Sequence, residues 1–311
     1  MLKDYGKVSI VMPAFNAEKY IVDAIDSVRN QTYTNWELLI VDDGSVDESA
    51  AISDDYAGKD SRIKVFHQPN GGVNSARAKG VDNASGEYLA FLDADDIFSP
   101  DALEYWVGNF RDTDDLIATW NKESEIGRDD YLVELWKGGI GPELWGKMFK
   151  MSKYRQMDYS IDQRMAMGED LFLNSIYALS VNQVRALPRK VYLVNYNNAT
   201  SVTRTFKHDW EYEKYYFNKI EESFLKNCSG LDCYDRICLL VNKSWLNAMK
   251  YVILDGGCIN YKDNEFKSVR SYFNERKDVL GPSEKLLLTV HDSFIFRLIM
   301  KVYLFIKHVG R

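Results

Sequence analysis

The chain has 311 residues, of which 46% are hydrophobic and 27% are charged, and its formal net charge is −7. This balance is typical of a folded soluble protein, and the length allows one large domain or two moderate ones. A negative chain lacks the basic surface of a general nucleic-acid binder, but it can still bind a nucleotide through a metal or through backbone amides.

The first hundred residues alternate between strand and helix patterns. Short apolar runs that end at polar turn residues predict strands, and apolar residues at helical spacing predict helices. The predicted strands are 8–12, 37–41, 63–66 and 88–92, and the predicted helices are 17–31, 47–56 and 74–84. This alternation indicates βαβ units and an α/β fold with a mostly parallel, Rossmann-like central sheet.

The remainder of the chain is predicted to form two parts. Residues 100–204 are less regular, with strand candidates at 116–120 and 191–194 and a helix that opens at 168–170. From residue 206 onward the pattern is helical and rich in aromatic residues and lysine. We therefore expect one domain at 1–205 and a helical C-terminal region at 206–311.

Carboxylates follow directly after the fourth predicted strand, at Asp93, Asp95 and Asp96. In an extended chain, residues i and i+2 point to the same side, so Asp93 and Asp95 are expected to project together. Two carboxylates at the carboxyl end of a buried strand form an oxygen-rich site for a hard divalent cation. An acidic turn that binds no ligand is the alternative.

Two more turn segments follow the first and second predicted strands, at 13–16 and 42–45. A parallel sheet brings the carboxyl ends of its strands to one edge, where a ligand can bridge them. The chain has no G-x-G-x-x-G turn and no G-x-x-x-x-G-K-[ST] loop, which argues against a dinucleotide site and against a P-loop NTPase.

Together these motifs resemble the family 2 glycosyltransferases, which have the GT-A nucleotide-sugar-binding fold. The resemblance rests on 8–16, 37–45, 70–72 with Ala76 and Arg77, 86–88, 91–96 and 168–170, and more loosely on 145–147 and 201–204. It implies an inverting, metal-dependent glycosyltransferase. Its donor-nucleotide half would lie at about 1–110 and its acceptor half at about 111–205.

The resemblance also implies a role for each donor-side residue. Asp95 is the expected ligand of Mn²⁺ or Mg²⁺, Asp93 contacts the metal or the donor ribose, and Asp96 lies behind them. Asp43 would accept a hydrogen bond from the nucleobase, which suggests uracil. The remaining donor-binding candidates are Pro13 and Phe15, which would frame the base, Ala14, Asn16, Asp42, Gly71 and Ala94, and Arg77, which would face the diphosphate or the Asp93 carboxylate.

The acceptor hydroxyl must lose a proton as it attacks, and a carboxylate within hydrogen-bond reach can take it. Asp170 is the expected base and Glu169 the second candidate, although acids at a helix start can also simply stabilise that helix. Inversion follows from one direct displacement with one base and no protein nucleophile. The candidate acceptor contacts are Trp145, Lys147 and Arg204, and core packing is the simpler explanation of Trp145.

The expected substrates are a nucleotide-sugar donor, with a UDP-sugar favoured, and a saccharide or lipid-linked saccharide acceptor in surface glycan assembly. A sugar nucleotidyltransferase is one alternative, but it would be expected to carry a glycine-rich basic loop where residues 13–16 stand. A non-catalytic nucleotide-sugar or glycan-binding module is the other, and it would not require the pair Glu169 and Asp170.

The C-terminal segment after Asp292 contains no acidic residue but has the basic residues Arg297, Lys301, Lys307 and Arg311. Most of its other residues are apolar: Phe294, Ile295, Leu298, Ile299, Val302, Phe305, Ile306 and Val309. A cationic helix with a wide apolar face suits an anionic membrane interface, and docking onto its own domain or a partner subunit is the alternative.

The cellular location is predicted from what the sequence lacks. The first apolar run, 8–12, is too short for a signal peptide, and no stretch is apolar enough to span a bilayer. The four cysteines are spaced for neither a zinc site nor a disulfide framework, which favours a reducing compartment. We therefore expect a cytoplasmic protein, peripheral on the cytoplasmic face of the membrane, with no nucleic-acid partner.

Overall fold

The computed structural model describes residues 5–159, 161–162, 164–165, 167–195, 206–290 and 292–309, the last of these by backbone alone from residue 302. The chain forms two compact units, Met1–Arg204 and Thr205–Arg311.

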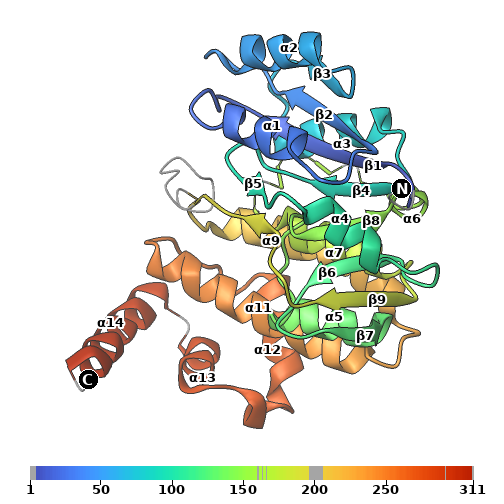
Figure 1. Ribbon diagram of the computed structural model, residues 1–311. Coiled ribbons are helices and arrows are strands. Elements are labelled where there is room, and N and C mark those ends of the chain that lie inside the picture. Colours follow the sequence, from blue (N-terminus) through green and yellow to red (C-terminus); the bar gives the residue numbers. More distant parts are fainter. Residues whose placement is uncertain are drawn as a thin grey trace. The chain divides into compact units, whose positions relative to one another are not determined.

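An eight-stranded sheet lies at the centre of the first unit, with the order β3-β2-β1-β4-β8-β6-β9-β7 (Figure 1). Its first four strands pair in parallel. They are β1 Val8–Ala14, β2 Trp36–Asp42, β3 Ile63–His67 and β4 Tyr88–Phe91. Every residue of β1, β2 and β4 is buried, as in parallel sheets covered on both faces. The predicted α/β fold with a mostly parallel central sheet is confirmed.

The second half of the sheet contains antiparallel pairs. Strand β8, Lys147–Lys150, is antiparallel to both β4 and β6, Leu116–Thr119. Strand β9, Gln183–Leu187, is parallel to β6 and antiparallel to β7, Ser124–Gly127. A separate antiparallel ribbon is formed by β5 Ile97–Phe98 and β10 Tyr192–Leu193. Strands β5, β7, β8 and β9 were not among the predicted elements.

Helices connect the strands of this unit. The predicted helices are present as α1 Ile21–Arg29, α2 Ser49–Lys59, α3 Val73–Asn83 and α7 Glu169–Ala178, accompanied by α4 Ala102–Asn109, α5 Arg128–Lys137 and α6 Met151–Tyr154. The chain runs outward from β1 to β3 and returns to β4 beside β1. Right-handed crossovers therefore place α1 and α2 on one face and α3 on the other.

Helix α3 packs closely on β1 because it carries a glycine at the contact. A β-carbon at Gly80 would collide with the side chain of Val11. This contact seats α3 directly on the face of β1, and Arg77 lies three residues before Gly80 in the same helix.

The second unit is helical, as predicted. Its elements are α9 Trp210–Ile220, the π-helical turn η1 Glu221–Leu225, α10 Lys226–Cys228, α11 Tyr234–Leu254, α12 Asn264–Asn274, the short 3-10 turn η2 Lys277–Val279, α13 Pro282–Thr289 and α14 Ser293–Val309. Within the described ranges, no helix combines the length and the apolar character needed to cross a bilayer.

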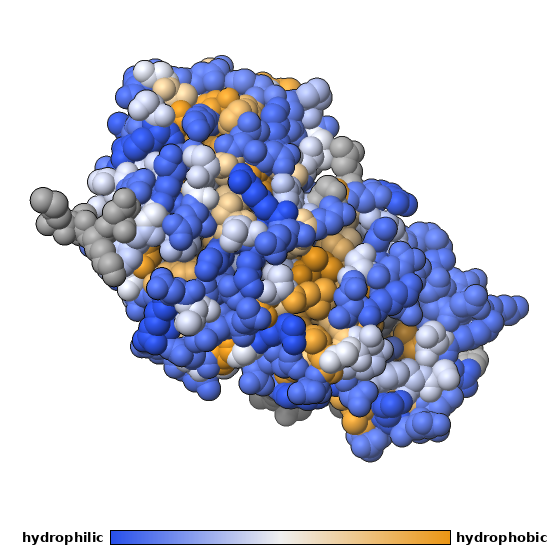
Figure 2. All heavy atoms as spheres, turned by 90° about the vertical axis from the view of Figure 1, so that its right-hand side faces the viewer, coloured by the Kyte–Doolittle hydropathy of each residue, from blue (hydrophilic) through white to orange (hydrophobic). Residues whose placement is uncertain are grey.

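On the face drawn in Figure 2, hydrophilic residues dominate and hydrophobic ones gather in a few patches.

Candidate functional site

The loops after β1 and β2 are tied together at the carboxyl edge of the sheet. The amide of Asp43 donates to the carbonyl of Ala14 at 2.8 Å, and the amide of Asn16 donates to the Ser45 hydroxyl at 3.0 Å. Of the two residues predicted to frame a nucleobase, Pro13 is buried and Phe15 is 50% exposed. An exposed aromatic ring on a fixed loop is therefore the feature that this edge offers to a planar ligand.

Asp43, the residue directly after β2, shapes the turn that begins α3. Asp43 is buried, and its carboxylate accepts hydrogen bonds from the amides of Gly71 and Gly72 at 2.8 and 2.7 Å and from the Gln68 side chain at 2.7 Å. Gly72 has a φ of 83°, which favours glycine. Asp42 lies beneath, accepting from the Ser45 amide. A direct bond from Asp43 to a nucleobase stays a prediction.

Arg77 joins three acidic residues from distant parts of the sequence. One terminal nitrogen, Nη2, donates to Asp93 Oδ1 at 3.1 Å. The other, Nη1, donates to Asp170 Oδ1 at 2.9 Å and lies 3.6 Å from Glu169 Oε1. Burial would lower the pKa of Arg77, but the charges of Asp170, Asp93 and Glu169 outweigh it and raise that pKa above its usual range. The guanidinium therefore stays charged and bridges both acidic motifs.

The acidic pair occupies the first turn of α7, after Gly168 with a φ of 81°. Besides Arg77, Asp170 is held by the amide of Leu144, which donates to Oδ2 at 3.3 Å. Burial raises the pKa of Asp170 and the charge of Asp93 adds to it, while Arg77 opposes the shift. Burial and the charge of Asp170 also raise the pKa of Glu169. Two carboxyl groups with raised pKa values in one cluster have the proton affinity that a general base needs.

The acids after β4 lie in a turn, and not in an extended strand. Strand β4 ends at Phe91, and the amide of Asp96 donates to the carbonyl of Asp93 at 3.0 Å. Asp93 and Asp95 were expected to point to the same side because they alternate along an extended strand. That expectation is wrong, because these residues are not part of the strand. Asp93 points toward Arg77, whereas Asp95 lines a pocket.

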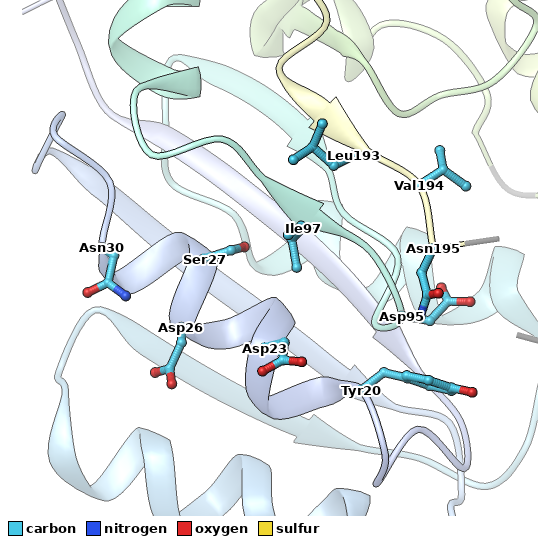
Figure 3. A pocket seen from close by; sticks show the side chains of 10 residues that line it. All are labelled: Tyr20, Asp23, Asp26, Ser27, Asn30, Asp95, Ile97, Leu193, Val194 and Asn195. Atoms are coloured by element: carbon cyan, nitrogen blue, oxygen red, sulfur yellow. The ribbon is translucent and has the colours of Figure 1, made fainter. Parts of the chain in front are cut away.

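Asp95 stands at one end of that pocket, which measures about 460 Å³ and is drawn in Figure 3. The pocket runs along α1 from Asn30 to Tyr20, between this helix and the β5–β10 ribbon (Figure 3). Its other lining residues are Asp23, Asp26, Ser27, Ile97, Leu193, Val194 and Asn195. The carboxylate predicted to bind a metal is thus accessible to a small ligand.

The buried carboxylate of Asp96 fixes the acidic turn through hydrogen bonds to the segment around Tyr192. This carboxylate accepts from the Tyr192 hydroxyl at 2.7 Å and from the Asn195 amide at 2.6 Å. The same hydroxyl accepts from the Asp93 amide at 3.1 Å, and the Tyr192 ring stacks on Trp145 with centroids 4.7 Å apart. Burial raises the pKa of Asp96 to about 6, against the opposing effect of these hydrogen bonds. These contacts hold the acidic turn in place, and a position of Asp96 behind the metal ligands stays a prediction.

The acceptor-side candidates are placed as follows. Trp145 packs against the core through Tyr192. Lys147 is buried and donates to the carbonyls of Gly141 and Glu143, and burial lowers its pKa to about 8. Both residues therefore support the loop that presents the Leu144 amide to Asp170, and acceptor binding by them stays a prediction. Arg204 lies outside the described residues.

The donor atoms at this edge fit a hard divalent cation. Asp95 supplies carboxylate oxygens at the pocket, the ligand type that Mg²⁺ and Mn²⁺ prefer, whereas the Asp93 carboxylate is paired with Arg77. In the described part of the chain, no group of three or more His, Cys, Asp or Glu residues is arranged to hold a metal. A cation that uses one or two carboxylates and completes its shell with phosphates and water does not need such a group.

Three residues of this site were missed by sequence reasoning: Tyr192, Gln68 and Leu144. Tyr192 falls in the predicted strand 191–194, but nothing in that run signals a partner for Asp96. Leu144 contributes only its backbone amide, which no residue type reveals. Gln68 directly follows β3, so its position at the common edge was the signal that could have identified it.

The comparisons with known proteins agree on one family. Residues 9–171, just over half of the chain, match the family model described as Glycosyl transferase family 2. EpsH of Bacillus subtilis (strain 168) is 32% identical over 200 residues, covering 57% of this chain and 58% of EpsH. Glycosyltransferase GlyA of Streptococcus pneumoniae serotype 4 is 29% identical over 235 residues, covering 68% of this chain and 33% of GlyA. The chain thus spans less than two thirds of either relative.

Two solved structures share the fold. The structure of S. aureus TarS 1-349 in complex with UDP matches with a TM-score of 0.66 and 18% identity, covering 98% of this chain and 92% of that one. The mannosyltransferase PcManGT from Pyrobaculum calidifontis, in complex with GDP-Man and Mn²⁺, matches with a TM-score of 0.53 and 12% identity, covering 96% and 87%.

Proposed function

The chain belongs to glycosyl transferase family 2 and has the GT-A fold, and from this premise we propose a metal-dependent, inverting sugar transfer at the edge described above. The donor is a nucleotide diphosphate sugar and the acceptor is a hydroxyl group of a saccharide. The observation that carries the proposal is the Arg77 bridge. It holds Asp93, from the acidic turn after β4, within one ion-pair cluster with Asp170, the expected base.

The donor is assigned to the loops after β1, β2 and β4. Phe15 offers an exposed ring, and the buried Asp43 donates through its amide to the carbonyl of Ala14, the residue before Phe15. Asp95 and Asp93 would hold Mn²⁺ or Mg²⁺, which when bound holds the diphosphate and neutralises the charge that develops as the glycosyl bond breaks. We favour uridine as the nucleoside, with support from the UDP complex of TarS, whereas the PcManGT complex with GDP-Man makes guanosine the alternative.

The chain's own residues supply the proton transfer and the positioning. Asp170 takes the proton of the attacking hydroxyl, because its carboxylate has a raised pKa and is fixed by two hydrogen bonds. Arg77 keeps that carboxylate oriented. A single displacement of this kind inverts the anomeric carbon, and it requires no protein nucleophile.

The division of labour along the chain is part of the proposal. We assign donor binding to about 1–110, acceptor binding to about 111–205, and attachment to a membrane or partner to 206–311. A saccharide carried on a lipid is the favoured acceptor, in surface glycan assembly. The reaction would then take place in the cytoplasm, at the inner face of the membrane.

A thermal-shift screen of nucleotide sugars with and without Mn²⁺ tests donor binding. A ligand at about a hundred times its dissociation constant stabilises the native state by roughly 2.7 kcal/mol. We expect a UDP-sugar to raise the melting temperature in the presence of Mn²⁺ and to have little effect with a chelator. Equal stabilisation with Mn²⁺ and with the chelator would contradict the role of the metal. If only GDP-sugars raise the melting temperature, the nucleoside is guanosine and not uridine.

Arg77→Lys is expected to slow sugar transfer by roughly ten- to a hundredfold. Lysine keeps the positive charge, but its single ammonium group does not reproduce the two-sided geometry that reaches Asp93 and Asp170. Losing one charge-assisted hydrogen bond costs roughly 1.5–3 kcal/mol, which corresponds to that range. With a weaker partner, Asp170 should also ionise at higher pH, so the acidic limb of the pH–rate profile should move upward.

Arg189→Lys is the matched control for this change. Arg189 makes a two-pronged ion pair with Asp101, and both side chains are exposed. Exposed pairs contribute little, so this variant should transfer sugar like the wild type. If Arg77→Lys also behaves like the wild type, the bridge has no role in positioning the base.

A further inference from the structure

Four large apolar side chains are exposed along one side of α14. They are Phe294, Ile295, Leu298 and Ile299, with exposed fractions of 71%, 48%, 55% and 39%. Their spacing, two neighbouring pairs four residues apart, places them on one face of the helix. We call this face the outer stripe.

The opposite side of α14 is already packed within the second unit. Phe296 and Met300 are buried, and α14 contacts α11 and α13. Arg297 donates to the carbonyls of Ile253 and Gly257, both at 2.7 Å, and so caps the carboxyl end of α11. The docking predicted as an alternative for this helix is present, yet it leaves the outer stripe uncovered by the described residues. The guanidinium of Arg297 is bonded to backbone carbonyls of the second unit, so we do not count Arg297 among the cations offered to a ligand.

The sequence after Asp292 differs in charge from the chain as a whole. The protein carries a net charge of −7, and its last acidic residue, Asp292, lies at the start of α14, where it accepts a hydrogen bond from the Ile295 amide. Lys301 is exposed on the next turn, and the sequence adds Lys307 and Arg311. Apolar side chains together with cations suit a ligand surface that is both hydrophobic and negatively charged.

We propose that the outer stripe of α14 is a docking surface for an anionic lipid membrane. A second copy of this chain is the alternative occupant, since a two-fold interface uses the same patch on both subunits, and light scattering tests it. Helix α14 is already formed and is fixed to α11 through Arg297, so the helix does not have to fold when the stripe binds a membrane. The inference rests on the proposed attachment of 206–311 to a membrane and names the surface that would make it. Its test measures vesicle binding, so it can fail while the proposed sugar transfer stands.

Vesicle co-sedimentation of the full chain tests this docking surface. We expect binding to phosphatidylglycerol vesicles at low salt, weaker binding at high salt, and little binding to phosphatidylcholine vesicles. Leu298→Glu places a negative charge in the stripe and should weaken binding at least tenfold. Lys301→Glu, at an exposed position where folding is not at issue, should also weaken it at least tenfold because it reverses a charge.

Val46→Glu is the matched control, since it makes the same kind of change at an apolar side chain that is 89% exposed in the first unit. It should sediment like the wild type. The proposal is overturned if the wild type ignores anionic vesicles at low salt, or if Leu298→Glu and Lys301→Glu bind as it does. It is also overturned if light scattering shows a wild-type dimer that Leu298→Glu converts to a monomer, because the stripe is then a self-interface.

Discussion

Asp170→Asn is expected to reduce sugar transfer by roughly a hundred- to ten-thousand-fold while donor binding is retained, which is the usual contribution of general-base catalysis. The amide keeps the size of the carboxylate but cannot accept the proton. Arg77 keeps its contacts with Asp93 and Glu169, so the cluster should remain folded. Single-turnover transfer and donor titration, measured on the same preparation, separate the two effects.

The pH dependence gives this prediction a second readout. Burial raises the pKa of Asp170, and only the ionised carboxylate can act as the base. Wild-type transfer should therefore rise with pH through that raised pKa, and this limb should disappear in Asp170→Asn. Glu169→Gln is the comparison. If it abolishes transfer while Asp170→Asn is active, Glu169 is the base, and if both variants are active, neither acid is.

Asp95→Asn is expected to lower metal-dependent donor binding and transfer by at least roughly a hundredfold. The change removes a charged ligand and keeps its shape, and even residues behind a metal ligand cost ten- to a hundredfold when they are altered. Titration calorimetry with a UDP-sugar, at increasing Mn²⁺ concentration, measures the loss directly.

Asp23→Asn is the control for Asp95→Asn, because Asp23 is a carboxylate that lines the same pocket from α1. It should leave the Mn²⁺ dependence unchanged. Asp95→Asn could bind the donor with the same Mn²⁺ dependence as the wild type, or Asp23→Asn could lose as much affinity as Asp95→Asn. Either result would show that the cation is not held by Asp95 as a specific ligand.

The parallel half of the fold could be predicted because its strands contain short apolar runs that end at polar turn residues. Residues 10–12 of β1 and 38–41 of β2 are apolar and buried, as in strands covered on both faces. The buried polar residues Ser9 and Glu37 hydrogen-bond to each other at 2.7 Å. Strand β8, Lys147–Lys150, could not be predicted in this way. It has only two apolar residues between lysines, and the burial of Lys147 depends on carbonyls of the preceding loop.

The site was predictable in its membership and less so in its geometry. The acids after β2 and β4 could be placed at one edge because strand ends in a parallel sheet converge. The turn at Asp93–Asp96 could not, since it is fixed by Tyr192, which lies about a hundred residues later in the chain. Contacts of this kind depend on tertiary packing, and no local pattern encodes them.

The short strand β8 makes the middle of the sheet a seam. Strands β1 and β2 pair along their full length, from Val8 with Trp36 to Ala14 with Asp42, whereas β4 and β8 pair only at Tyr88 with Lys150 and Leu89 with Phe149. Segments that share few backbone hydrogen bonds open at lower free energy than the whole domain, so amide exchange should be faster at the β4–β8 pairing than at the β1–β2 pairing. Asp93 and Asp170 stand on opposite sides of the seam in the chain, joined by Arg77. A local opening would separate them while the parallel strands stay paired, so catalytic competence is the first property that such an opening removes.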